Sequence, residues 1–147
     1  MAGEPVIVRI IDYHSQDYIR EVSLRHSVLR EPLGLSFSEE QLQAEADDIH
    51  FNAFTGETLL GTLLMRIISS DEIKMRQVAV WPEVQKAGIG KALVYFSEGW
   101  AKGRGFRKIT LHARESAVPF YTKLGYTVYG PPFYEVNLPH VAMKKYI

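Results

Sequence analysis

The sequence predicts a fold in which helices pack on a mixed β-sheet, that is, an α/β fold of the α+β type. Two observations lead to this prediction. Three successive strand-like segments joined by tight turns indicate an antiparallel meander, at 49–54, 58–68 and 72–80. A glycine-containing loop at 85–91 then separates the last of these strands from a helix-like segment, and another strand follows at 108–113. Strands and helices therefore share one layered unit.

The first third of the chain predicts a strand and two helices. A β-branched run indicates a strand at 6–12, and a polar helix start follows at 14–17. The residues at helical spacing are Tyr18, Val22, Arg25 and Leu29. Proline and glycine end this helix at 31–34. Ser38-Glu39-Glu40-Gln41 is typical of a capping box and predicts a short second helix.

The second half predicts two further helices and three strands. The helix after the loop has one apolar face and is closed by Gly103 and Gly105. The residues of that face are Ile89, Leu93, Phe96 and Trp100. The other expected elements are a strand at 108–113, a short helix at 118–124, and strands at 127–129 and 141–145. No repeat or interdomain linker interrupts them, so we expect a single domain over 1–147.

Composition sets limits on function. The formal charge is zero, with 17 basic and 17 acidic residues, so no bulk field favours nucleic acid or an anionic membrane. The chain has no cysteine, which excludes disulfides, a cysteine nucleophile and thiolate metal sites. No apolar run approaches the ~20 residues of a membrane span, and the N-terminus lacks the features of a signal peptide. We therefore expect a cytoplasmic protein with no nucleic-acid or membrane partner.

The loop Gln85-Lys86-Ala87-Gly88-Ile89-Gly90-Lys91 is the strongest functional signal in the chain. A glycine pair before a helix is often only a tight turn. Here the first turn is basic, however, and Lys86 and Lys91 oppose the positive end of the helix dipole unless an anion lies between them. The unpaired N–H groups of a helix start suit phosphate. We therefore predict a phosphate site at this loop.

Two common phosphate motifs do not fit the loop. A Walker loop aligned on Gly90 would have Gln85 at its first glycine and Ala92 at its hydroxyl position. A dinucleotide fingerprint that begins at Gly88 would have Leu93 at its third glycine. The pattern that remains is Gln-x-x-Gly-x-Gly.

This pattern resembles the pyrophosphate loop of the GNAT superfamily of N-acetyltransferases, and two further blocks support the resemblance. Residues 75–82, Met-Arg-Gln-Val-Ala-Val-Trp-Pro, resemble the family's fourth strand. Residues 117–126, with Phe120-Tyr121 and Gly125-Tyr126, resemble its second signature. Residues 25–34 resemble a block in small prokaryotic members. The resemblance implies a central mixed, mostly antiparallel sheet flanked by about four helices.

The resemblance also implies acetyl-CoA as co-substrate, no metal, and direct transfer to a primary amine. Val78, Ala79 and Val80 would contact the pantetheine arm and the acetyl carbonyl through their backbone, and Tyr121 would protonate the leaving thiolate. Taken only from its spacing, Tyr121 is more typical of a core aromatic. The other residues implied to contact the coenzyme are Gln85, Lys86, Ala87, Gly88, Ile89, Gly90, Lys91, Arg114 and Ala117.

The acceptor side is less defined by the sequence. The candidate bases are Glu135 and His140, in a polar loop that enters the last strand, although such loops are often only solvated surface. Gln77 is either a satisfied core residue or a pocket group that positions a water. The arginines Arg25 and Arg30 are expected to bind an acidic part of the acceptor or to lie on a solvated helix face. A lone strand histidine such as His112 is more often structural than catalytic.

Three classes of function remain open at this point. An acetyltransferase would release free thiol with an amine acceptor, whereas a regulatory module would bind acetyl-CoA without turnover. A partner protein on a decayed fold would bind no coenzyme. Family members often form homodimers, and the identity of the acceptor is not encoded in any motif described above.

Overall fold

The computed structural model describes residues 4–147 and, within them, one seven-stranded sheet in the order β1-β2-β3-β4-β5-β7-β6. The strands are β1 (Val6–Ile11), β2 (Ile49–Thr55), β3 (Thr58–Ile67), β4 (Glu72–Val80), β5 (Lys108–Arg114), β6 (Thr127–Glu135) and β7 (Leu138–Tyr146). The helices are α1 (Gln16–Arg25), α2 (Glu39–Gln43), α3 (Ile89–Gly103) and α4 (Val118–Lys123). Only β4 and β5 pair in parallel, which confirms the mixed, mostly antiparallel sheet.

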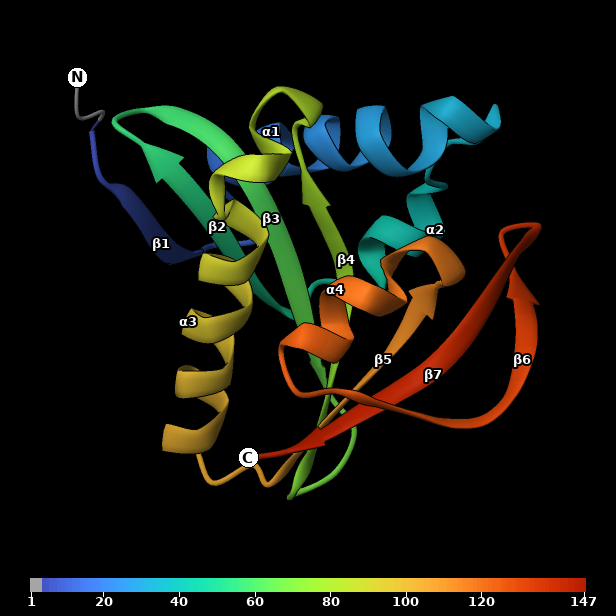
Figure 1. Cartoon of the computed structure of the whole chain (residues 1–147). Coiled ribbons are helices and arrows are strands. Elements are labelled where there is room, and N and C mark those ends of the chain that lie inside the picture. The colour runs from blue at the N-terminus through green and yellow to red at the C-terminus, as the bar shows by residue number, and fades with distance from the viewer. Residues whose placement is uncertain (1–3) are drawn as a thin grey trace.

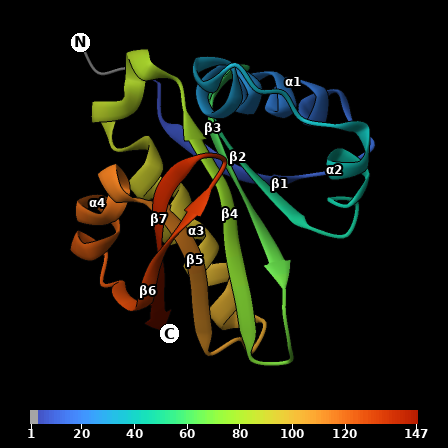
Figure 2. The same ribbon diagram turned by 90° about the vertical axis from the view of Figure 1, so that its right-hand side faces the viewer.

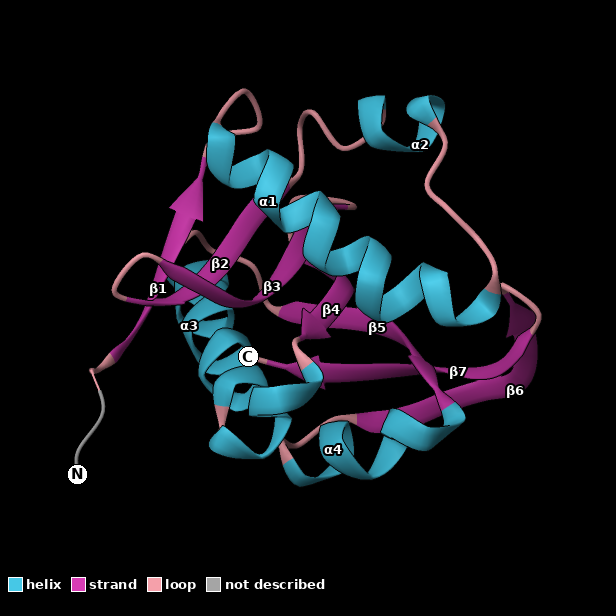
Figure 3. Cartoon of the chain, turned by 90° about the horizontal axis from the view of Figure 1, so that it is seen from above, coloured by secondary structure: helices cyan, strands magenta, loops and turns pink. Residues whose placement is uncertain are grey.

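The helices cover both faces of the sheet. Helices α1 and α2 lie on one face, and α3 and α4 lie on the other (Figures 1 and 2). A larger apolar cluster fills the α3 side, and a smaller one around Leu24 and Phe54 lies under α1. Seen from above, α1 crosses the sheet while α3 runs beneath it (Figure 3). Between residues 4 and 147, no helix has the length and apolar character needed to cross a membrane.

The buried row of α3 differs from the predicted one. Ile89 and Leu93 are buried as expected, but the row continues through Ser97 and Ala101, and Phe96 is 44% exposed. Small residues at 97 and 101 allow the helix to approach the sheet closely, so the deepest row follows i, i+4 spacing. Phe96 instead packs on the flank, with its ring centroid 6.0 Å from that of Phe51.

A bulge in β4 separates the two parallel strands. The pairing of β4 with β5 runs from Glu72 opposite Lys108 to Met75 opposite Leu111 and then stops. Just beyond, the register between β3 and β4 shifts, and Gln77 has a φ of 56°. A bulge bends its strand and increases the local twist. The carboxyl ends of β4 and β5 therefore diverge, as Figure 1 shows.

The predicted polar loop before the last strand is a tight β-hairpin. β6 extends to Glu135, β7 begins at Leu138, and only Val136 and Asn137 lie between them. Both turn residues have positive φ, 46° and 63°. A two-residue turn of this kind matches the right-handed twist of the paired strands, although it strains a β-branched residue. The prediction of a polar loop was wrong, because valine is not a residue typical of tight turns and the sequence therefore contains no turn signal here.

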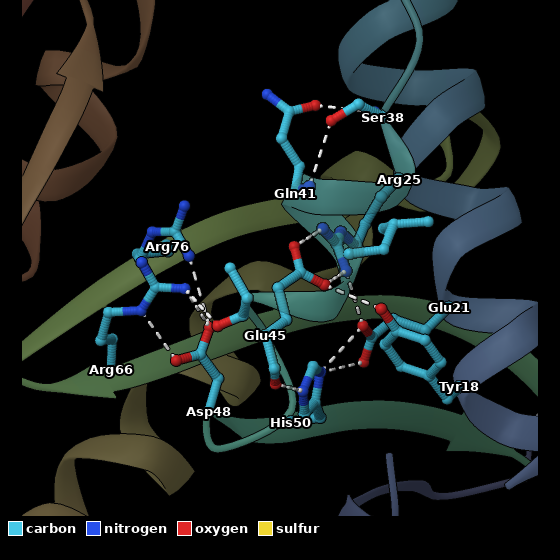
Figure 4. A network of polar contacts seen from close by, with 12 residues as sticks. Tyr18, Glu21, Arg25, Ser38, Gln41, Glu45, Asp48, His50, Arg66 and Arg76 are labelled. Atoms are coloured by element: carbon cyan, nitrogen blue, oxygen red, sulfur yellow. Dashed lines mark hydrogen bonds and ion pairs between the residues drawn. The ribbon is translucent and has the colours of Figure 1, made fainter. Parts of the chain in front are cut away.

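Buried polar groups attach α1 to the sheet (Figure 4). The Arg25 guanidinium donates to Glu21 at 2.9 Å and forms an ion pair with Glu45, and all three side chains are almost fully buried. His50 on β2 contacts a Glu21 oxygen at 3.0 Å and the Glu45 carbonyl at 3.0 Å. The Tyr18 hydroxyl donates to Glu45 at 3.0 Å. Each buried charge thus has a partner, as burial requires.

The capping box of α2 is confirmed. The Ser38 hydroxyl accepts from the backbone of Gln41 at 3.1 Å, and the Gln41 side chain accepts from the backbone of Ser38 at 2.8 Å. This short helix leads directly to Glu45 and to Asp48, whose carboxylate pairs with Arg66 and Arg76 (Figure 4). The capped turn therefore helps to place the carboxylate that neutralises Arg25.

Candidate active site

A cavity of about 160 Å³ opens where β4 and β5 diverge. It lies between the two strands, the turn after α1, the start of α4 and the β6–β7 hairpin. The sequence-predicted residues that line it are Arg30, Gln77, Val78, Arg114, Ala117, Tyr121, Glu135 and His140. The divergence frees backbone groups of β4 that a neighbouring strand would otherwise pair. The site therefore combines an open strand edge with polar side chains from several distant segments.

The predicted phosphate loop lies at the carboxyl end of β4. A 3-10 turn (Pro82–Ala87) leads to Gly88, whose φ of 81° caps the start of α3. The first bond inside the helix joins the Ala92 N–H to the Gly88 carbonyl, so the amides just before it have no helical acceptor. Lys86 and Lys91 are exposed beside them. The loop thus has the donors and charge that an anion requires.

Gln85 contributes a contact that the sequence did not indicate. Its side-chain amide donates to the Val80 carbonyl at 3.1 Å, which closes the loop onto the end of β4. Ile89 has its side chain in the core, at 2% exposure, so only its backbone faces the loop. An ideal Cβ on Gly90 would lie 3.2 Å from Phe120 of α4. A side chain at position 90 would therefore press on the Phe120 ring, which would have to shift by a few tenths of an ångström.

Tyr121 lies at the inner wall of the cavity. It is 7% exposed, and its ring is edge-on to Phe120 and Tyr126 at centroid distances of 5.1 and 5.8 Å. Burial raises the pKa of its hydroxyl, because the phenolate would lose hydration. The side chain is thus both part of the core and part of the cavity lining, and its hydroxyl stays protonated at neutral pH.

Two histidines flank the carboxylate of Glu135. The Nδ1 atom of His112 lies 3.0 Å from one Glu135 oxygen, and the Nε2 atom of His140 lies 3.8 Å from the other. Burial acts to raise the Glu135 pKa, but the His112 hydrogen bond and the charges of His112, His140 and Lys74 outweigh it and lower that pKa. His112 lines the cavity beside Glu135, so the structure adds it to the candidate site residues. The signal in the sequence was that His112 and Arg114 are two residues apart on β5, so their side chains lie on the same face of the strand.

Each histidine has one ring nitrogen that is left to accept a proton, and His140 is buried. The Nδ1 of His140 is 2.9 Å from the Leu138 carbonyl, which only accepts, so this nitrogen carries the hydrogen. By the same reasoning, Nδ1 of His112 donates to the Glu135 carboxylate. In the neutral rings, Nε2 is therefore the basic atom of each residue.

Gln77 occupies the bulge and lines the cavity. Its side-chain oxygen is buried and has no hydrogen-bond partner within residues 4–147. A buried amide oxygen without a partner costs free energy, so a satisfied core role does not explain this residue. Its position suits a contact to a bound water or ligand.

The two candidate acceptor arginines lie in different surroundings. Arg25 is fully buried and paired with Glu21 and Glu45, so both expectations for it, acceptor contact and solvated helix face, were wrong. Arg30 lines the cavity and lies over the Phe37 ring at 4.6 Å. Their spacing in the sequence suggested similar positions for Arg25 and Arg30. In the structure only Arg30, in the turn after α1, faces the cavity.

The bulge in β4 divides the sheet, a phosphate-type loop follows β4, and a tyrosine lies across the gap. Together these features define the kind of site that acyl-CoA transferases have. The chain belongs to the acetyltransferase (GNAT) domain family, whose model matches residues 21–147. It is an acetyl-CoA-dependent N-acetyltransferase of that family.

Individual proteins are similar to this chain over most of its length. The uncharacterized protein YyaT of Bacillus subtilis (strain 168) is 31% identical over 133 residues, which cover 83% of this chain and 88% of YyaT. A Lactobacillus plantarum structure, provisionally named an N-acetyltransferase, superposes with a TM-score of 0.84 at 22% identity and covers 99% of both chains. An Elizabethkingia anophelis GNAT acetyltransferase with acetyl-CoA bound has a TM-score of 0.74 at 14% identity and covers 97% of this chain and 98% of that one.

Proposed function

We propose that the protein moves an acetyl group from acetyl-CoA to a primary amine by direct attack, without a covalent enzyme intermediate. The observation that carries the proposal is the divergence of β4 and β5, with the anion loop at one end and the Glu135 cluster at the other. The coenzyme would lie in the gap with its pyrophosphate on the amides of 85–90. The acceptor would enter between Arg30 and the β6–β7 hairpin.

The pantetheine arm would add to the open edge of β4 as an extra strand. Backbone groups of Val78, Ala79 and Val80 would bind it, because a strand edge offers regularly spaced donors and acceptors. Ala117 and the aliphatic part of Arg114 lie across the gap and would contact the same arm, which leaves the guanidinium group of Arg114 for another ligand. One backbone N–H of β4 near the bulge would stabilise the oxyanion that forms at the acetyl carbonyl.

The acceptor amine needs a base. An ordinary lysine-like amine has a pKa near ~10.4, so its neutral form at pH 7 costs about 4.6 kcal/mol. Glu135 and His140 are the proposed bases, and the geometry adds His112 to them. The histidine neighbours hold Glu135 ionised, so its carboxylate is free to take up a proton, but its lowered pKa makes it a weaker base and favours a role in orienting a histidine that takes the proton.

Tyr121 is proposed as the acid at the leaving sulfur. Its raised pKa keeps the hydroxyl protonated, but it also makes full proton transfer to a thiolate of pKa near ~8.5 less favourable. We therefore expect Tyr121 to act mainly by a hydrogen bond to the developing thiolate. Such a bond matters most in the transition state, where the charge on sulfur grows.

Thiol release during an acceptor-library screen tests the proposal, after a thermal-shift measurement has established acetyl-CoA binding. We expect release of free coenzyme thiol only in the presence of a suitable amine, together with an acetylated product. Tight binding of acetyl-CoA with no thiol release across primary amines of varied size and charge would reject transfer to a primary amine.

A further inference from the structure

Two arginines of the cavity share a single acceptor. Arg114 on β5 donates to the Leu29 carbonyl at 3.0 Å, and Arg30 donates to the same oxygen at 3.3 Å. Both side chains line the cavity. A guanidinium carries five N–H donors, so one shared carbonyl leaves most of them unused. Among residues 4–147, neither arginine forms an ion pair with a carboxylate.

The surroundings of these two groups hold more positive than negative charge. Both arginines are half-buried, and burial lowers the pKa of each; the charges of Arg114 and Arg25 lower the pKa of Arg30 further, and the Glu135 charge opposes them. Arg76 in the same cavity is different, because Asp48 lies 3.3 Å from its guanidinium. Two partly desolvated cations that have no ion pair of their own favour binding of an anion between them.

The negative charge of the cavity comes from another element. Glu135 on the β6–β7 hairpin lies with His112 and His140, where the amine of the acceptor is expected to lose its proton. Arg30 comes from the turn after α1 and Arg114 from the end of β5. A ligand that spans these elements would present an amine to the carboxylate cluster and an anionic group to the two arginines.

We infer that the acceptor carries an oxyanion, a carboxylate or a phosphate, in addition to its amine, and that Arg30 and Arg114 bind this group. The inference rests on the proposed acetyl transfer for the identity of the amine. The oxyanion follows from the two guanidinium groups, which have no carboxylate partner among residues 4–147. Planar guanidinium forks match carboxylate and phosphate oxygens, so either source satisfies the same chemistry.

Three probes that share a two-carbon amine test the inference. They are β-alanine, phosphoethanolamine and ethanolamine, which carry a carboxylate, a phosphate and a hydroxyl. Each is titrated by calorimetry into protein saturated with coenzyme A, so the anions of the coenzyme already occupy their own site. We expect at least one anionic probe to bind more tightly than ethanolamine, by a factor of about ten or more, because it would form charge-assisted hydrogen bonds that the hydroxyl of ethanolamine cannot form. Which of the two prevails identifies the oxyanion.

Variants connect the preference to the arginines. Arg30→Gln should clearly reduce the ratio of anionic to neutral affinity, and Arg30→Gln combined with Arg114→Gln should bring it to near one. Arg30→Lys should keep more of the ratio than Arg30→Gln, because the charge remains. Arg104→Gln is the matched control, since Arg104 lies over Trp100 on the far end of α3 and should leave the ratio unchanged. Arg76→Gln should reduce the ratio less than Arg30→Gln, because Asp48 already offsets its charge.

Binding and transfer separate this inference from the proposed function. Preferential binding of an anionic probe without thiol release would support the oxyanion site and reject acetyl transfer to that amine. Thiol release with all three probes at equal efficiency would support the transfer and overturn the oxyanion site. Equal affinities, or no measurable binding of any probe, would overturn it as well, and so would a preference that is unchanged in the variant with both Arg30→Gln and Arg114→Gln.

Discussion

At the scale of single residues, the proposed chemistry depends on a few side chains whose surroundings differ sharply. Tyr121 is enclosed by aromatic rings, whereas Glu135 has a half-exposed carboxylate between two histidines. Burial therefore keeps the tyrosine protonated, and neighbouring histidines keep the glutamate ionised. An acid and a base held apart in this way are what acyl transfer to an amine requires.

Removing the hydroxyl of Tyr121 tests the role of the acid. Tyr121→Phe should lower kcat by about 10²-fold with little change in coenzyme affinity, because the lost hydrogen bond forms mainly in the transition state. Steady-state kinetics and calorimetry measure the two quantities. Tyr126→Phe serves as the control, since its hydroxyl bonds Glu98 away from the cavity. A near-normal kcat in Tyr121→Phe would leave this tyrosine with a packing role.

The pH dependence of kcat/KM identifies the base. A histidine base places a rising limb near ~6.5, whereas a carboxylate base leaves the rate flat above ~5, and the lowered pKa of Glu135 extends that plateau to more acidic pH. Loss of the base should slow transfer to a basic amine by about 10² to 10⁴-fold and affect a weakly basic aniline much less. The variants are Glu135→Gln, His140→Ala and His112→Ala. Full activity in all three would transfer the role to a water held by Gln77.

At the scale of elements, the active site is assembled from strand ends and turns whose geometry is unusual. The β4 bulge separates two strands, the Gly88 turn begins α3, and the Val136-Asn137 turn closes the hairpin. At each of these places the backbone has a positive φ angle, which lies in the left-handed region. For Val136 this conformation is strained, because a β-branched side chain is crowded there. Local strain of this kind is often found in residues that form a binding site.

The loop between β4 and α3 gives a prediction at this scale. Gly88→Val should abolish coenzyme binding, because a side chain at a φ of 81° distorts the backbone that presents the amides. Gly90→Val should have the same effect and also displace Phe120. Gly99→Ala is the matched control, since a Cβ there meets nothing within 4 Å. Calorimetry measures binding and circular dichroism the fold, and wild-type affinity in folded Gly88→Val would contradict the assignment.

At the scale of the whole molecule, α1 is attached to the sheet by charges as much as by apolar packing. His50 on β2 connects Glu21 of α1 with the segment that carries Glu45 (Figure 4). Burial by itself lowers the His50 pKa, but the hydrogen bond and charge of Glu21, with the contacts to Glu45, raise it above its usual value. The protonated histidine is therefore favoured in the folded state.

This histidine makes stability depend on pH. Because its pKa is higher when folded, its contribution is complete below the unfolded value of ~6.5 and is lost as pH rises through the folded value. The free energy of unfolding from urea titrations should fall above about pH 6.5, by at most about 1.4 kcal/mol per pH unit. His50→Gln should be less stable and should lack this slope. A wild-type stability that stays constant or rises from pH 6.5 to 8 would contradict the prediction.

The sequence predicted most of the elements because their signals are local. The capping box at Ser38, the meander and the glycine-rich start of α3 each follow from a few neighbouring residues. The burial of Arg25 could not be predicted in this way, since its partner Glu45 lies on another segment. His112 and Glu135 meet because β7 lies between β5 and β6, and that strand order is not encoded in spacing. Local sequence patterns therefore do not predict charge pairs between residues that only the order of the strands and helices brings together.

The enclosed trio Glu21, Arg25 and Glu45 restricts how this protein can change over evolutionary time. Replacing Arg25 by an apolar residue leaves the buried carboxylates of Glu21 and Glu45 with only His50 as a neighbour that can carry positive charge, a change that costs roughly 3–5 kcal/mol, whereas apolar replacement of the whole set is often tolerated. Loss of Arg25 alone is therefore unfavourable, and the three positions should vary together. Descendants that lack Arg25 are expected to have lost both glutamates as well.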